Sequence, residues 1–373
     1  MLVSLAANLY SCYLLIEVAD TIGAGALTDI GFAAFGQKGK IASEILLVLS
    51  QFGFCTAYVY FIASQLGGVG GVIQCATSNN GDPEDCSDGG IISKWWWLLI
   101  TLGLYLPLVY VRKIEKLAFT HVFSDILIII SIIVLCIYCG IDIAERPGWA
   151  PECILAVSPS FWPSAIGFSM YAFEGIGVIL PIKEITEKKE DYFKIFAMVV
   201  GGIGIFYIFF SEYMIFGYGA ERVYHPLITE SLPRKSPVTY GIKILFSIML
   251  LFTYPLQIFP ANNVIESYLT PGWPKTRKRQ LCKNISRTIV VTLSCILAIS
   301  AYDEVEKLLA IVGALTCCPM AFALPAACHY KLVAKTTTQK TIDMIMFVFS
   351  IGATVFCTEE VFRTWTQSTE VVC

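Results

Sequence analysis

A chain of 373 residues in which 56% are hydrophobic and only 15% are charged cannot give a soluble fold an ordinary polar surface. The mean hydropathy is +0.68, and a net charge of −3 without a basic stripe gives no indication of nucleic acid binding. The composition therefore predicts an integral membrane protein whose main surroundings are the lipid bilayer.

Ten apolar runs, most of them close to the length that crosses a bilayer, follow one another along the chain. We expect an all-α, multi-pass protein forming a single transmembrane domain over residues 1–373. The residues between the second and third runs, 67–94, are the longest polar stretch and are expected to form an outer loop. The expected spans are about 2–19, 41–66, 95–111, 117–141, 161–182, 196–219, 237–260, 285–302, 307–330 and 342–358.

The lysines and arginines indicate how these spans are oriented. One set of alternate loops holds 17 of these residues and the opposite set holds 7. Cytosolic loops carry the excess of positive charge. We therefore expect the richer set, which includes the loops after the first, fifth and ninth spans, to face the cytosol.

Most of the 14 cysteines lie inside apolar runs, so they do not form a small disulfide scaffold. Cys75 and Cys86 are different, because both lie in the expected outer loop, where an oxidising exterior favours a disulfide. They are expected to pair with each other or with Cys153 in the next outer loop. The cysteine and histidine spacing indicates no metal site, and we expect no metal or organic cofactor.

The fifth run, residues 161–182, contains Glu174 between Phe173 and Gly175, with Gly177 close behind. Glu174 lies about 12 Å of helix rise from one end of the run and about 20 Å from the other, which is near the midplane of a bilayer. An ionisable group there costs about 2.5–3.5 kcal/mol or more, and glycine weakens the helix beside it. A broken helix with a polar group at the midplane is typical of the substrate sites of secondary transporters.

Other side chains are candidates for the same substrate site. Thr253, Tyr254 and Gln257 lie beside Pro255, and Gln51 and Tyr58 share one helix face because they are seven residues apart. Simple interhelical hydrogen bonding and core packing are the alternative explanations. The full set of candidate substrate-binding residues is Tyr171, Phe173, Glu174, Gly175, Ile176, Gly177, Gln51, Tyr58, Thr253, Tyr254 and Gln257.

Two acids are candidates for coupling transport to a proton. Glu174 is the first, either as the proton carrier or as the group that organises the unwound turn. Glu212 is the second, although it lies close enough to the outer end of its span to reach water instead. The chain contains no motif of a metalloprotease, serine hydrolase or nucleotide-binding enzyme, so we do not expect an enzyme.

Four phrases carry a family resemblance, in order and with the right spacing. They are YAFEGIGVILPIKE at 171–184, QFGFCTAY at 51–58, FTYPLQ at 252–257 followed by Pro260 and Ala261, and RTIV at 287–290 with SCILA at 294–298. Together they resemble the amino acid/auxin permease superfamily, most closely its proton-coupled amino acid transporter branch. In that branch a Phe-Glu-Gly-Ile-Gly run marks the sixth helix.

The resemblance implies an eleven-helix, broken-helix inverted-repeat fold, in which the ten expected spans would be the second to eleventh helices. The family's first helix is then expected to be missing. By resemblance, the chain moves small neutral amino acids by alternating access, with a proton as the coupling ion and sodium as the alternative. The competing reading is a non-transporting amino acid sensor, or a truncated or inactive paralogue with the same fold. The membrane is expected to be either the plasma membrane or a lysosomal or vacuolar membrane.

Overall fold

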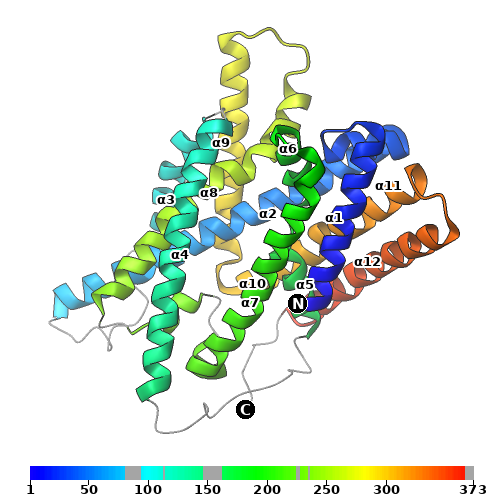
Figure 1. The fold of residues 1–373 in the computed structure, drawn as a ribbon. Coiled ribbons are helices and arrows are strands. Elements are labelled where there is room, and N and C mark those ends of the chain that lie inside the picture. The colour runs from blue at the N-terminus through cyan, green and yellow to red at the C-terminus, as the bar shows by residue number, and fades with distance from the viewer. Residues whose placement is uncertain (80–93, 112–113, 146–161, 224–226, 234–235, 366–373) are drawn as a thin grey trace. The chain divides into compact units, whose positions relative to one another are not determined.

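The computed structural model describes residues 1–79, 94–111, 114–145, 162–223, 227–233 and 236–365, and the regular structure within these ranges is entirely helical (Figure 1). The helices are α1 (Leu2–Ile22), α2 (Leu27–Asn79), α3 (Lys94–Val109), α4 (Ile114–Glu145), α5 (Trp162–Ala172), α6 (Ile176–Ile185), α7 (Tyr192–Val223), α8 (Pro237–Leu269), α9 (Arg277–Ser300), α10 (Val305–Val312), α11 (Leu324–Leu332) and α12 (Thr337–Arg363).

The helices have the length and composition of a membrane protein. Within the described residues, nine helical segments are long and apolar enough to cross a membrane, and Trp95–Val109 is a shorter apolar helix. Two π-helical segments, η4 (Gly313–Cys317) and η5 (Pro319–Ala323), join α10 to α11. The all-α, multi-pass prediction is therefore confirmed.

Several helix ends have local causes that the sequence shows. Ser236 caps α8 by accepting from the Val238 N–H, and Pro237 occupies the first helical position, where its missing donor costs nothing. Thr336 and Gln339 form a reciprocal capping box at the start of α12. At the other end of a helix, Gly23 terminates α1 in the left-handed region, with φ of 70°.

The boundary of the expected outer loop was wrong on one side. Residues 67–79, which were expected to begin the polar outer loop, continue α2 as helix and include four glycines. The glycines allow close packing instead: a Cβ on Gly70 would lie 2.7 Å from the Trp97 ring, and one on Gly68 would lie 3.3 Å from Lys243 Nζ. The small residues thus let α2 pack against neighbouring side chains, as small residues do between membrane helices.

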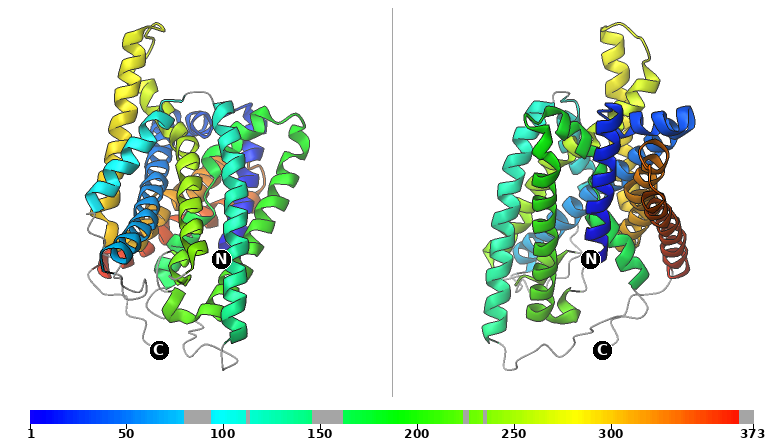
Figure 2. Two further views of the ribbon diagram at one scale, coloured as in Figure 1. Left: turned by 90° about the vertical axis from the view of Figure 1, so that its left-hand side faces the viewer. Right: turned by 45° about the vertical axis from the view of Figure 1, so that its right-hand side comes forward.

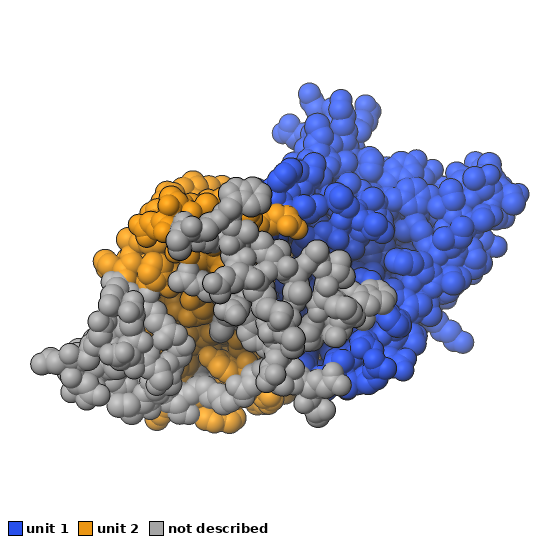
Figure 3. Space-filling model, turned by 90° about the horizontal axis from the view of Figure 1, so that it is seen from below, with its two compact units in different colours: residues 1–50, 156–211, 306–369 blue, residues 51–155, 212–305, 370–373 orange. Residues whose placement is uncertain are grey.

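The chain forms two compact units, which are coloured separately in Figure 3. Unit 1 comprises residues 1–50, 156–211 and 306–369, and unit 2 comprises residues 51–155, 212–305 and 370–373. Both units are assembled from segments far apart in the sequence. The long helices α2 and α7 each contribute residues to both units.

In unit 1, α1 packs along α11 and also contacts α5, α6 and η5 (Figures 1 and 2). Ser11 of α1 donates to the Ala321 carbonyl in η5, where the π-helical turns have a different hydrogen-bond pattern from an α-helix. Helix α5 approaches α10 and η4 backbone to backbone. A Cβ on Gly167 would lie 2.8 Å from the Ala310 carbonyl oxygen of α10, and the Gly167 carbonyl lies against Gly313 of η4. Small residues make this contact possible.

In unit 2, α4 runs beside α8, and α3 packs on both α8 and α9 (Figure 2). A buried ion cluster joins three of these helices. The Arg287 Nε atom of α9 lies 2.6 Å from Glu266 Oε1 of α8, with side chains that are only 3% and 4% exposed. Arg287 Nη1 also donates to the Val109 carbonyl at the end of α3, 2.6 Å away. Lys283 Nζ completes the cluster, 2.6 Å from Glu266 Oε2.

This cluster predicts a large loss of stability when one charge is removed. Replacing Glu266 by Leu leaves Arg287 buried without its carboxylate, which we expect to lower the free energy of unfolding by about 3–5 kcal/mol. The double variant Glu266→Leu/Arg287→Met should lower the free energy of unfolding by less, because it removes both buried charges. Unfolding in detergent measures both variants.

The control is Arg363→Ala, which breaks a pair with Glu360 in which the arginine side chain is 72% exposed. An exposed pair contributes about 0–1 kcal/mol. Equal decreases in the free energy of unfolding for Glu266→Leu and Arg363→Ala would show that the buried cluster does not stabilise unit 2.

Candidate functional site

The interruption predicted at Glu174 is present in unit 1. Helix α5 ends at Ala172 and α6 begins at Ile176. The Phe173 N–H still donates to the Ser169 carbonyl over 3.2 Å, whereas the Glu174 N–H donates to Tyr171 in a tighter turn, over 3.3 Å. The chain therefore leaves the α-helical pattern at the three residues Phe173, Glu174 and Gly175.

The Glu174 carboxylate lies at the N-terminus of α6. It faces the backbone N–H groups of Ile176 and Gly177 and interacts with them electrostatically, and these groups have no carbonyl partner within their own helix. A negative charge at this end of a helix is also favoured by the helix dipole. The acid that precedes the short helix α6 is therefore favourably placed at its positive end.

The rest of the Glu174 side chain faces the interior of unit 1. The residue is partly exposed, but its Oε1 atom is buried and has no hydrogen-bond partner among the described residues. The buried thiols of Cys12 on α1 and Cys317 on η4 lie within electrostatic range of it. This oxygen is therefore free to bind a proton or a donor group.

Helix α1 supports the break from the side. Asn8 is 3% exposed, and its Nδ2 donates to the Phe173 carbonyl over 2.9 Å. One turn away, the hydroxyls of Ser4 and Ser169 are 2.8 Å apart. The contribution of Asn8 was missed by sequence reasoning, although a lone amide in an apolar run is a signal that it needs a buried partner.

The other predicted residues of the sixth-helix phrase are placed as follows. Phe173 and Ile176 are buried in unit 1, with the Phe173 ring 6.2 Å from the ring of Tyr207. Tyr171 is partly exposed, and its ring stacks on Phe168 at 6.0 Å. A Cβ on Gly175 would lie more than 4 Å from every described group, so there is open space beside this residue.

The remaining predicted residues come together in unit 2. Gln257 Nε2 donates to Gln51 Oε1 over 2.7 Å, which joins α8 to α2. The fully buried Tyr254 has its hydroxyl 2.9 Å from that of Ser294. Its ring stacks on Tyr105, whose own hydroxyl has no hydrogen-bond partner among the described residues.

Thr253 and Tyr58 are less directly engaged with this polar group. The Thr253 hydroxyl donates to the Met249 carbonyl of its own helix over 2.9 Å, as threonine commonly does in membrane helices. Tyr58 is partly exposed and lies within electrostatic range of Tyr105. The predicted residues of the sixth-helix phrase therefore lie in unit 1, and Gln51, Tyr58, Thr253, Tyr254 and Gln257 lie in unit 2.

Two other sets of predicted residues have different outcomes. The Glu212 side chain is exposed on α7, in contrast to the partly exposed Glu174 with its buried oxygen. Of the disulfide candidates, Cys86 and Cys153 lie outside the described residues. Cys75 falls in α2, but its side chain is not described, so the pairing stays a prediction.

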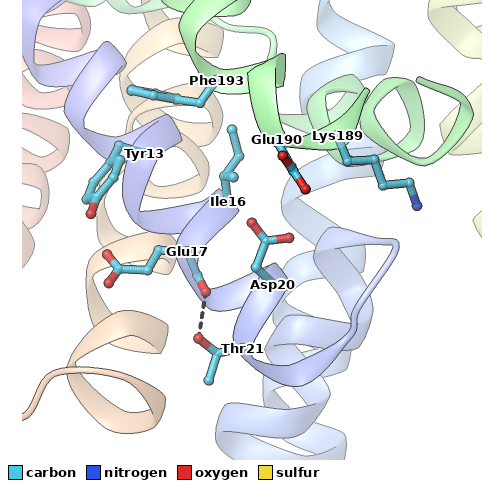
Figure 4. Close-up of a pocket in the computed structure, with 8 residues that line it drawn as sticks. All are labelled: Tyr13, Ile16, Glu17, Asp20, Thr21, Lys189, Glu190 and Phe193. Carbon is cyan, nitrogen blue, oxygen red and sulfur yellow. Dashed lines mark hydrogen bonds between the residues drawn. The ribbon is translucent and has the colours of Figure 1, made fainter. Parts of the chain in front are cut away.

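A pocket of about 410 Å³ in unit 1 contains none of the predicted residues (Figure 4). Its walls are the C-terminal turns of α1, from Tyr13 to Thr21, the 3₁₀ turn η1 (Lys189–Asp191) with Lys189 and Glu190, and Phe193 at the start of α7. Sequence reasoning missed it because its walls come from helices more than 150 residues apart.

These features define a multi-pass helical membrane protein with a helix broken around a carboxylate, which is the architecture of secondary transporters. The sequence model of the family described as "Transmembrane amino acid transporter protein" matches residues 1–363. The chain belongs to this family, which is one of transporters rather than enzymes.

Curated relatives agree with this assignment. The chain is 26% identical to "Vacuolar amino acid transporter 3" of Saccharomyces cerevisiae, over 98% of this chain and 52% of the relative. It is 28% identical to the Schizosaccharomyces pombe protein of the same name, over 93% of this chain and 50% of the relative. It is also 25% identical to "Amino acid transporter AVT3B" of Arabidopsis thaliana, over 99% of this chain and 85% of the relative. The chain therefore spans about half the length of the yeast relatives.

Among solved structures, the chain is similar to a Na⁺-coupled sialic acid symporter in a substrate-bound outward-open state. The TM-score is 0.53 at 10% identity, and the match covers 97% of this chain and 83% of the symporter. At this identity the likeness concerns the fold alone. It confirms the predicted broken-helix transporter fold.

The support of the break by Asn8 can be tested by mutation. Replacing Asn8 by Leu removes the donor and leaves the Phe173 carbonyl without its side-chain partner. An unsatisfied buried group costs about 1–3 kcal/mol, and we expect a loss of this size in the free energy of unfolding. Thr21→Val is the matched control, because the Thr21 hydroxyl donates to a carbonyl of the same helix at an exposed position. If Asn8→Leu and Thr21→Val lower the free energy of unfolding by equally small amounts, α1 does not support the break.

Proposed function

We propose that this chain is an amino acid transporter that works by alternating access. The observation that carries the proposal is the interruption of the sixth-helix phrase between α5 and α6, with Glu174 at the start of α6. Family membership and the printed names of the relatives support the substrate class. Broken helices of this kind present backbone groups to a zwitterion without burying a full opposing charge.

Small neutral amino acids suit the surroundings of Glu174. The described side chains close to its carboxylate, Cys12 and Cys317, are uncharged thiols. They provide no partner for a charged substrate side chain. The Glu174 Oε1 atom, buried and unpartnered, is the acceptor available for the substrate ammonium group or for a proton.

The coupling ion in this proposal is a proton, with sodium as the alternative. Glu174 has two features that suit proton coupling: its carboxylate faces the N-terminus of α6, and its Oε1 atom has no partner among the described residues. Taking up a proton on Oε1 would neutralise the acid inside the bundle and weaken its hold on α6. Glu212, the other candidate, is exposed.

The membrane we propose is that of a vacuole or lysosome, because the two yeast relatives are named vacuolar transporters. The plasma membrane is the alternative. An acidic compartment would supply the proton gradient that the proposed symport needs.

Uptake into proteoliposomes tests the function and the coupling together. With a proton gradient imposed, wild-type protein should accumulate alanine or another small neutral amino acid, and dissipating the gradient should lower the initial rate. Glu174→Gln should make that rate independent of the gradient, since an amide cannot exchange the proton.

Glu212→Gln decides between the two candidate acids. If it removes the gradient dependence and Glu174→Gln does not, the assignment of Glu174 is wrong. A protein that is stabilised against unfolding by an amino acid but shows neither uptake nor counterflow would be a sensor, and the proposed transport would be wrong.

A further inference from the structure

A second ionisable cluster lies in unit 1, built from three different helices. His329 of α11 has its Nδ1 2.7 Å from Asp343 Oδ2 of α12 and its Nε2 3.5 Å from Glu17 Oε2 of α1. The side chains of His329 and Asp343 are 1% and 0% exposed, and that of Glu17 is 31% exposed. The imidazole is thus enclosed between two carboxylates, one of which reaches solvent.

The hydrogen-bonding groups of this cluster are incomplete. Both His329 Nε2 and Asp343 Oδ1 are buried without a hydrogen-bond partner among the described residues. If a neutral imidazole donates from Nδ1 to Asp343, its Nε2 is an acceptor facing the Glu17 carboxylate, which is also an acceptor. If it donates from Nε2 instead, Nδ1 faces Asp343 in the same unfavourable way.

One additional proton resolves this conflict. An imidazolium donates from both nitrogens, so it can serve Asp343 and Glu17 at the same time through charge-assisted bonds. The net charge of the three groups then falls from two negative charges to one. Since buried charge is costly unless it is paired, the geometry favours proton binding at this place.

The neighbouring charged groups do not replace that proton. From α1, the hydroxyls of Tyr10 and Tyr13 lie within electrostatic range of the cluster, Tyr10 of Asp343 and Glu17 and Tyr13 of Glu17. On α11 and α12, Lys331 lies over the Phe35 ring at 4.7 Å, and Lys340 lies over the Tyr330 ring at 5.8 Å. In the described part of the chain, the ion pairs of Glu17 and Asp343 are with His329.

The pocket beside α1 gives water a route to the cluster. Glu17 contributes to its wall, and the pocket also contains Asp20 and Glu190 with a single lysine, Lys189. Figure 4 shows the carboxylates of Asp20 and Glu190 turned toward each other and that of Glu17 turned to the opposite side. An acidic lining raises the local concentration of cations. By the distribution of lysine and arginine, this end of unit 1 faces the cytosol.

We propose that Glu17, His329 and Asp343 form a proton-binding site, separate from Glu174, that exchanges its proton with the pocket beside α1. Hydronium in the pocket gives its proton to His329 Nε2 by way of Glu17, leaving water, and release reverses the step. The bound proton holds α1 to α11 and α12, and its release removes that attraction. The site itself does not depend on transport, but its role as the cytosolic exit for a coupled proton rests on the proposed function.

Nuclear magnetic resonance of protein carrying ¹⁵N-labelled histidine tests the site directly. The chain has three histidines, and His329→Gln and His121→Gln each remove one signal and so assign the spectrum. The spectra are recorded between about pH 5 and pH 8, the interval in which an imidazole side chain can exchange its proton. At pH 6, Glu17→Gln and Asp343→Asn should lower its protonated fraction at least threefold, since each removes a carboxylate that stabilises the imidazolium.

His121 is the internal control, because it pairs with Asp125 on a single helix, α4, with 34% of its side chain exposed. Its titration should not change in either carboxylate variant. A His329 signal that does not titrate in this range, or that titrates identically in wild type and Glu17→Gln, overturns the proposal. Glu17 is partly exposed, so this variant keeps the test valid if Asp343→Asn fails to fold.

Transport measurements then test the role in coupling. His329→Gln should abolish the dependence of net uptake on the pH of the cytosolic-side compartment while keeping exchange within about threefold of wild type. Unchanged pH dependence in His329→Gln, with active wild type, overturns the coupling role. Wild-type protein without any transport refutes the proposed function instead, and the titration of His329 is unaffected by that outcome.

Discussion

The constraint on which the structure depends is that the hydrocarbon of a membrane contains no water to satisfy backbone polar groups. A broken helix exposes several such groups at once, so each break needs partners from neighbouring helices. At the break after α5, the Phe173 carbonyl is satisfied by Asn8, and the Glu174 carboxylate faces the first N–H groups of α6. At η5, the Ala321 carbonyl is satisfied by Ser11. One helix, α1, therefore supports both the break after α5 and the π-helical segment η5.

This arrangement links the candidate site to the packing of α1. The same helix carries Asn8 and Cys12 near the break and Glu17 two to three turns later at the pocket. Asn8 and Glu17 lie about 13 Å apart along α1, at a rise of about 1.5 Å per residue. A displacement at one end of a rigid helix moves the other end with it. In the proposed proton site, a change in the protonation of His329 acts on the same helix that holds the broken helix in place.

Buried charges follow the same rule as the backbone groups, because an ion in a low-dielectric interior must be paired. In unit 2, Glu266 and Arg287 join α8 to α9, and Lys243 pairs with Glu230 at 2.7 Å. In unit 1, Lys183 of α6 pairs with Asp20 of α1. Each pair joins segments separated in the sequence, so the pairs specify which helices are neighbours as well as offsetting the cost of burial.

The sequence alone determined the properties that depend on composition and on local pattern. Apolar runs of about 20 residues revealed the spans, and the glycines beside Glu174 revealed the break between α5 and α6, since both follow from the solvation of one segment by lipid. The polar stretch at 67–94 was a poorer guide. Residues 67–79 continue α2, where glycine permits close packing against Trp97 rather than a loop.

Tertiary structure alone decided which polar groups meet. Asn8 and Phe173 are 165 residues apart, and nothing in either segment indicates the other. His329, with Glu17 on one side and Asp343 on the other, was an unremarked residue in the sequence because its environment comes from three helices. A partner's identity depends on which helix faces pack together, and that is set by the sum of many contacts rather than by any local pattern.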